Sequence, residues 1–67
     1  MQKIQANTLG NRIKNSNADT IVIIDSVVYT CLGKGKWENS NKQKITWFEL
    51  GAIASAKGTN EIDYIKK

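Results

Sequence analysis

The chain has no histidine, no proline and one cysteine, Cys31, among its 67 residues. Without histidine it lacks the most common general base and a common metal ligand. A single cysteine cannot form an intramolecular disulfide, which small secreted domains usually need for stability. We therefore expect a protein that is not an enzyme, that holds no metal or cofactor, and that folds by packing alone in the cytoplasm.

The sequence also lacks a long apolar run. Its longest such run, Ile21–Ile24, is far shorter than the roughly 20 residues that cross a bilayer. The start of the chain, MQKIQANTLGNRIK, has no apolar stretch of signal-peptide length. A chain of this size forms one small core and buries about 60% of the surface that its unfolded form exposes. We expect one domain, residues 1–67, with no membrane partner and no deep active site.

β-Branched residues and turn signals predict a small antiparallel sheet. Two apolar, β-branched stretches flank the dipeptide Asp25-Ser26, which predicts a hairpin over about 20–32. A short third strand is expected over about 36–39, after a glycine-containing turn. The alternation of apolar and polar residues over about 61–65 predicts a C-terminal strand.

The clearest local signal predicts a helix over about 47–57. Thr46 and Glu49 have the spacing of a capping box, in which each side chain accepts a hydrogen bond from the backbone N–H of the other residue. Gly58 follows at the expected C-terminal cap, and a polar loop over 39–44 precedes the helix. The apolar stripe of this helix, expected to pack on the sheet, comprises Trp47, Leu50, Ile53 and Ala54.

The first 19 residues are polar and weakly patterned. Leu9 and Ile13 are four residues apart, which predicts a possible short helix over about 8–14 with Asn7 or Thr8 as its cap. The fold expected from all these signals is an α+β domain, in which one main helix packs on a small antiparallel sheet.

Residues 33–47 carry a net charge of +3, from four lysines and one glutamate, out of +4 for the whole chain. Clustered positive charge favours contact with the phosphates of nucleic acid, and aromatic faces add stacking with unpaired bases. The expected site comprises Lys34, Lys36, Trp37, Lys42 and Lys44. Trp47 is assigned to the core. For Trp37 two interpretations stay open, packing in the core or at a sheet edge, and an exposed face that could stack. The sequence also leaves open whether Arg12 and Lys14 join these lysines.

The alternative is a protein inhibitor or adaptor of the kind that phages and mobile elements encode to bind a host protein. Phe48 falls outside the apolar stripe of the helix and is the candidate anchor at such an interface. A strand over 36–39 or 61–65 could lie at a sheet edge and accept a strand from a partner, including a second copy of this chain. The sequence decides neither the partner nor the choice between DNA, RNA and protein.

Overall fold

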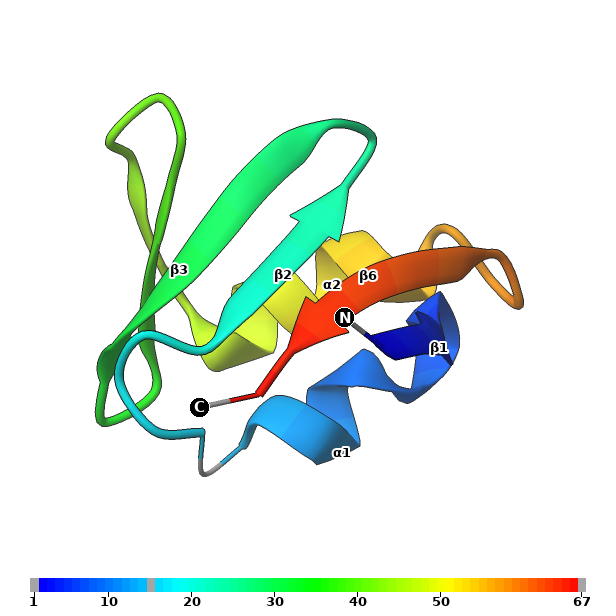
Figure 1. Cartoon of the computed structure of the whole chain (residues 1–67), viewed down its shortest axis with the longest axis horizontal. Helices are drawn as coiled ribbons and strands as arrows, with labels where there is room; N and C mark the ends of the chain where they lie inside the picture. The colour runs from blue at the N-terminus through cyan, green and yellow to red at the C-terminus, as the bar shows by residue number, and fades with distance from the viewer. Residues whose placement is uncertain (1, 15, 67) are drawn as a thin grey trace.

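Six strands form one antiparallel sheet in the computed structural model, which describes residues 2–14 and 16–66. The order across the sheet is β1-β6-β2-β3-β4-β5. Figure 1 shows α2 behind β2 and β6, with α1 below them. The strands are β1 (Gln2–Gln5), β2 (Ile21–Ile24), β3 (Val27–Gly33), β4 (Lys36–Asn39), β5 (Lys44–Thr46) and β6 (Glu61–Ile65). The helices are a 3₁₀ turn (Ala6–Thr8), α1 (Leu9–Ile13) and α2 (Trp47–Ser55).

This arrangement confirms the predicted class, a small α+β domain, and its predicted hairpin, third strand and C-terminal strand. The sequence did not predict β1 or β5. In β1, Ile4 is the only buried residue, and it lies opposite Ile62 of β6. The strand β1 therefore depends on pairing with residues distant in the sequence, which leaves no local pattern. β5 begins at Lys44, the last residue of the predicted loop, and with 3 residues it is too short to show alternation of apolar and polar residues.

The β2–β3 turn places both of its central residues in the left-handed region, with φ of 51° at Asp25 and 66° at Ser26. Two-residue turns of this kind match the twist of antiparallel strands and usually carry glycine at the second position. Ser26 therefore occupies a conformation that is unfavourable for a residue with a Cβ.

The polar loop between β4 and β5 is ordered by one side chain. The Asn39 Oδ1 accepts hydrogen bonds from the N–H groups of Asn41 (2.9 Å) and Gln43 (3.0 Å). The Asn39 side-chain amide also donates to the Gln43 Oε1 at 3.0 Å. These bonds substitute for the strand pairing that a turn interrupts.

The capping box at the start of α2 is present as predicted. The Glu49 N–H donates to the Thr46 hydroxyl, and the Thr46 N–H donates to the Glu49 carboxylate, each at 3.2 Å. The helix ends at Ser55, slightly before the predicted end, and turn residues lead to Gly58, whose φ is +61°. No helix in the ranges 2–14 and 16–66 is long and apolar enough to span a bilayer.

The buried face of α2 is directed partly toward α1. Leu50 and Ala54 are buried as predicted, but Ile53 is 38% exposed, so its assignment to the core stripe was wrong. Gly51 is buried instead, and a Cβ added there would lie 3.2 Å from the Gly10 Cα. The helices α1 and α2 therefore approach each other closely at Gly10 and Gly51. The side of α2 that faces α1 is buried in consequence, and Ile53 lies outside it.

The predicted N-terminal helix corresponds to the 3₁₀ turn and α1, and it buries Leu9 and Ile13 completely. Its predicted side-chain cap is wrong. Neither α1 nor the 3₁₀ turn has a side-chain cap, and the Thr8 hydroxyl donates to the Gln5 carbonyl oxygen at 2.7 Å instead. Packing of the two apolar residues under the sheet, and not capping, holds this segment in place.

Candidate functional site

Of the two tryptophans, Trp47 and not Trp37 keeps exposed surface. Trp37 has no exposed surface, so its interpretation as a core residue is confirmed and its place in the expected site, with an indole that stacks on bases, is wrong. It lies opposite Cys31 in the register of β3 and β4, on the face of the sheet that forms the core. Trp47, expected in the core, is only partly buried and packs against the core from the start of α2.

Trp47 is held in place by the β3–β4 turn. The backbone N–H of Trp47 donates to the Gly35 carbonyl oxygen at 2.7 Å. Gly35 has a φ of +76°, and a Cβ built on it would lie 2.7 Å from the Trp47 Cδ1. The bare backbone of Gly35 therefore provides the space in which the indole rests.

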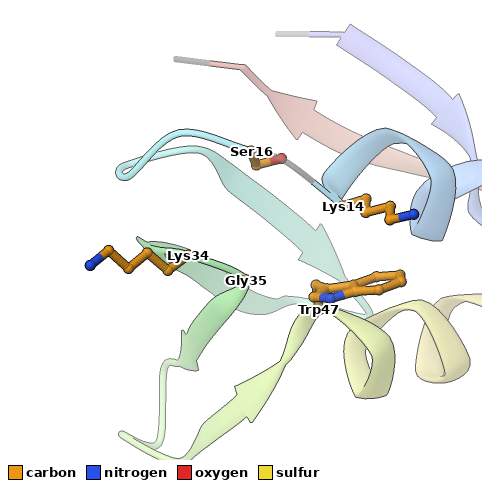
Figure 2. Close-up of a pocket in the computed structure, with 5 residues that line it drawn as sticks. All are labelled: Lys14, Ser16, Lys34, Gly35 and Trp47. Carbon is orange, nitrogen blue, oxygen red and sulfur yellow. The ribbon is translucent and has the colours of Figure 1, made fainter.

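A hollow of about 380 Å³ opens beside this indole. Figure 2 shows Lys14 and Ser16 on one side of it and Gly35 and Trp47 on the other, with the Lys34 side chain extending outward. Its lining residues are Lys14, Ser16, Lys34, Gly35 and Trp47. Lys14, which follows α1, thus joins Lys34 of the β3–β4 turn, although the two are far apart in the sequence.

The wall of this hollow contains a hydroxyl group without a hydrogen-bond partner. The Ser16 Oγ is buried and bonds to no other atom in the described part of the chain. The Ser16 backbone is fixed, since its N–H donates to the Ile13 carbonyl (3.2 Å) and its own carbonyl accepts from the Cys31 thiol (3.6 Å). A buried polar group without a partner is uncommon in folded proteins, so this hydroxyl is a candidate ligand contact.

The other predicted lysines do not gather at this hollow. Lys36 and Lys44 lie on the neighbouring strands β4 and β5 and line a smaller hollow of about 220 Å³ that also contains Glu49. The Lys44 ammonium is 3.7 Å from the Glu38 carboxylate, which offsets part of its charge. Lys42 lies in the β4–β5 loop, after the last residue of β4, whereas Lys34 lies in the turn before its first residue.

Phe48 is 70% exposed, in agreement with its predicted position outside the apolar stripe. Its ring meets that of Trp47 edge to face, with centroids 5.8 Å apart and planes at 82°. Both rings also line a second hollow of about 390 Å³ between α1 and α2. The remaining residues of this second hollow are Asn7, Gly10, Asn11, Gly51, Ala52 and Ser55.

Besides Lys44, two further lysines away from the Trp47 hollow form ion pairs within the protein. Lys3 of β1 lies 2.7 Å from Asp63 of β6, and Lys57 pairs with Asp25. A hydrogen bond and the charge of Asp63 raise the pKa of the Lys3 ammonium. Lys14 and Lys34 have no such carboxylate partner within residues 2–14 and 16–66, so their charge is available to a ligand.

The predicted edge strands are not edges. β4 pairs with β3 and β5, and β6 pairs with β1 and β2, so neither has an unpaired side for a partner strand. The outer strands are β1 and β5, which the sequence did not predict. In the described ranges, no three acidic or cysteine side chains gather as a metal site would require.

We compared the chain with protein-family models, with curated proteins and with solved structures, and none of them matched it.

Proposed function

We propose that this protein is a small non-catalytic module that binds nucleic acid through the surface around Trp47. The observation that carries the proposal is the hollow beside that indole, in which two lysines with no ion-pair partner accompany an aromatic side chain and no carboxylate. Lys14 and Lys34 neutralise phosphates, and Trp47 takes the role that the sequence analysis gave to Trp37. Lys36 extends the positive surface along β4.

Nucleic acid fits this site better than an acidic peptide would, because phosphates occur at regular spacing beside flat bases. Lysine ammonium groups release condensed counterions when they contact phosphates, and this release drives association. An aromatic side chain adds stacking energy that depends little on the identity of the base. Side chains suited to both kinds of contact line one hollow, on segments that the fold brings together.

The proposal is tested by titrating labelled mixed-sequence DNA and RNA, single-stranded and duplex, at 50 and 200 mM salt with fluorescence anisotropy. For two or three phosphate contacts, we expect the affinity to fall roughly 7- to 40-fold between these salt concentrations. The variant Lys14→Gln/Lys34→Gln should bind more weakly and show a smaller salt dependence. No binding of any of these nucleic acids at 50 mM salt would refute the proposal.

The matched control is Lys3→Gln/Lys57→Gln, which removes the same net charge from two lysines that are paired within the protein. Exposed ion pairs contribute little to stability, so the control should fold. If it weakened binding as much as the Lys14/Lys34 variant, overall charge and not the Trp47 hollow would account for the affinity.

A second candidate function is the binding of a partner protein, as an inhibitor or adaptor, through Phe48. The large exposed fraction of this side chain and the second hollow beside it favour the candidate. Here Phe48 inserts into an apolar pocket of the partner, as aromatic anchors do at many interfaces. If protein binding through Phe48 is the function, neither wild type nor Phe48→Ala should show salt-dependent binding of nucleic acid. If wild type binds and Phe48→Ala loses that binding, Phe48 belongs to a nucleic-acid surface.

A further inference from the structure

The depth of Trp47 determines which form of nucleic acid can reach it. The indole is partly buried and forms one side of a hollow, next to Gly35 and across from Ser16. A base within a duplex is stacked on both faces and paired at its edge, so it cannot enter such a hollow. An unpaired base can leave its neighbours and place one face on an aromatic ring.

The size of the hollow limits how much of a strand it accepts. Its volume of about 380 Å³ is at the lower end of the roughly 300–1,000 Å³ that small-molecule sites occupy. That space suits one nucleotide and not a run of stacked bases. The edge-to-face contact with Phe48 supports this limit, because rings at 82° cannot continue one stack of parallel bases.

The two lysines lie where the backbone of such a nucleotide would continue. Lys14 is beside the indole, whereas the Lys34 side chain leads away from it at the other end of the hollow (Figure 2). A strand whose base rests on Trp47 therefore has one phosphate near Lys14 and the next toward Lys34. Because lysine side chains are long and flexible, both can follow the strand.

Ser16 supplies a hydroxyl group that can both donate and accept a hydrogen bond, whereas a lysine ammonium group can only donate. Its buried hydroxyl has no partner in the described ranges, and a serine side chain can turn between staggered rotamers toward a group seated in the hollow. The hydroxyl can donate or accept a hydrogen bond. It can therefore bond to a base edge or a sugar without selecting one base.

We infer that the ligand is single-stranded nucleic acid, and that one unpaired base stacks on Trp47 while Lys14 and Lys34 contact the phosphates on either side. This inference rests on the proposed function and adds the form of the ligand and the contact made by each residue. It predicts a preference for single strands over duplex that comes from one stacking contact.

The test compares an oligothymidylate strand, its duplex and an abasic strand of equal length and charge at 50 mM salt. One stacked base contributes about 1–3 kcal/mol, which corresponds to roughly 5- to 150-fold in affinity. We expect wild type to prefer the single strand over the duplex and over the abasic strand by a factor in this range. Trp47→Leu should lose that preference, and Ser16→Ala should weaken single-strand binding without changing its salt dependence.

Intrinsic fluorescence adds a readout that phosphate contact alone would not change. Trp37 is buried, so quenching by the strand should come from Trp47 and should disappear in Trp47→Leu. Phe48→Leu is the matched control, since it removes the neighbouring ring but leaves the hollow and its quenching intact. The abasic comparison uses wild type, so it tests the inference even if Trp47→Leu does not fold.

The possible results distinguish the stacking contact from nucleic-acid binding as such. Equal affinity for the single strand and the abasic strand, or tighter binding of the duplex, would overturn the stacking inference and leave the proposed function standing. Unchanged single-strand affinity in folded Trp47→Leu would do the same. No binding of any of the three nucleic acids would overturn both.

Discussion

Several residues of this protein adopt a left-handed backbone that non-glycine residues rarely adopt. These non-glycine residues are Asp19, Asp25, Ser26, Lys34 and Lys42. Lys34 and Gly35 together form the tight turn after β3, with φ of 55° and 76°. Asparagine and glycine are the residues usually preferred in such a turn. The lysine at position 34 thus sits where asparagine would be more stable, and strain of this kind often accompanies a functional residue.

A pair of substitutions separates turn strain from binding. Ser26→Gly and Lys34→Asn should each stabilise the protein by about 1 kcal/mol, because they relieve the left-handed conformation. For a domain of this size, that raises the melting temperature by about 4–8 °C. Only Lys34→Asn should also weaken binding of single strands, measured by the same anisotropy titration.

The contrary results for these variants are equally specific. If Lys34→Asn leaves affinity unchanged, Lys34 makes no phosphate contact and its place at the turn has another cause. If Ser26→Gly lowers the melting temperature measured by circular dichroism, the Ser26 side chain makes a stabilising contact that outweighs the strain.

At the scale of elements, α2 connects the stability of the fold to the position of the site. Trp47 is the first residue of α2, so the cap formed by Thr46 and Glu49 fixes the backbone from which the indole projects. The hydrogen bond from the backbone N–H of Trp47 to the Gly35 carbonyl connects the first residue of the helix to the β3–β4 turn. A weakened cap should therefore affect both the helix and the hollow.

The substitution Thr46→Ala tests this connection. Loss of the side-chain cap should destabilise the protein by about 0.5–2 kcal/mol, because the Glu49 N–H loses its partner. Thr46→Ser keeps the hydroxyl and should retain most of the stability. Urea denaturation followed by circular dichroism measures both variants. Equal stability of Thr46→Ala and wild type would show that packing alone holds the start of α2.

At the scale of the whole molecule, stability depends on one small core. A domain of 67 residues typically has an unfolding free energy of about 3–10 kcal/mol. Trp37 is the largest fully buried side chain, and it belongs to the one core cluster, which contains residues from both helices and most of the strands. Because Trp37 fills a large part of this small core, we expect the stability of the fold to depend strongly on its side chain.

Trp37→Ala should destabilise the protein by about 3–5 kcal/mol, because it empties the largest buried side-chain volume of the core. Trp37→Phe retains an aromatic ring in the core and should leave a folded protein with a lower melting temperature. Thermal unfolding and one-dimensional proton NMR distinguish the two results. A melting temperature for Trp37→Ala equal to that of wild type would contradict the assignment of Trp37 to the core.

The sequence by itself determined the features whose signals are local. The two-residue break at Asp25-Ser26 predicted the hairpin of β2 and β3, and the spacing of Thr46 and Glu49 predicted the start of α2. These predictions succeeded because turns and caps depend on hydrogen bonds and backbone preferences within a few residues. The exposure of Phe48 followed in the same way from its place on the helix.

Only the tertiary structure decided which tryptophan faces water and which lysines share a site. Trp37 is buried because strand pairing places it opposite Cys31 on the face of the sheet that forms the core, and Trp47 lies at the rim because α2 turns toward α1. Lys14, just after α1, and Lys34, in the β3–β4 turn, line the same hollow because the fold brings these two distant segments to its two ends. These arrangements arise from contacts between residues distant in the chain, for which a single sequence carries no local pattern.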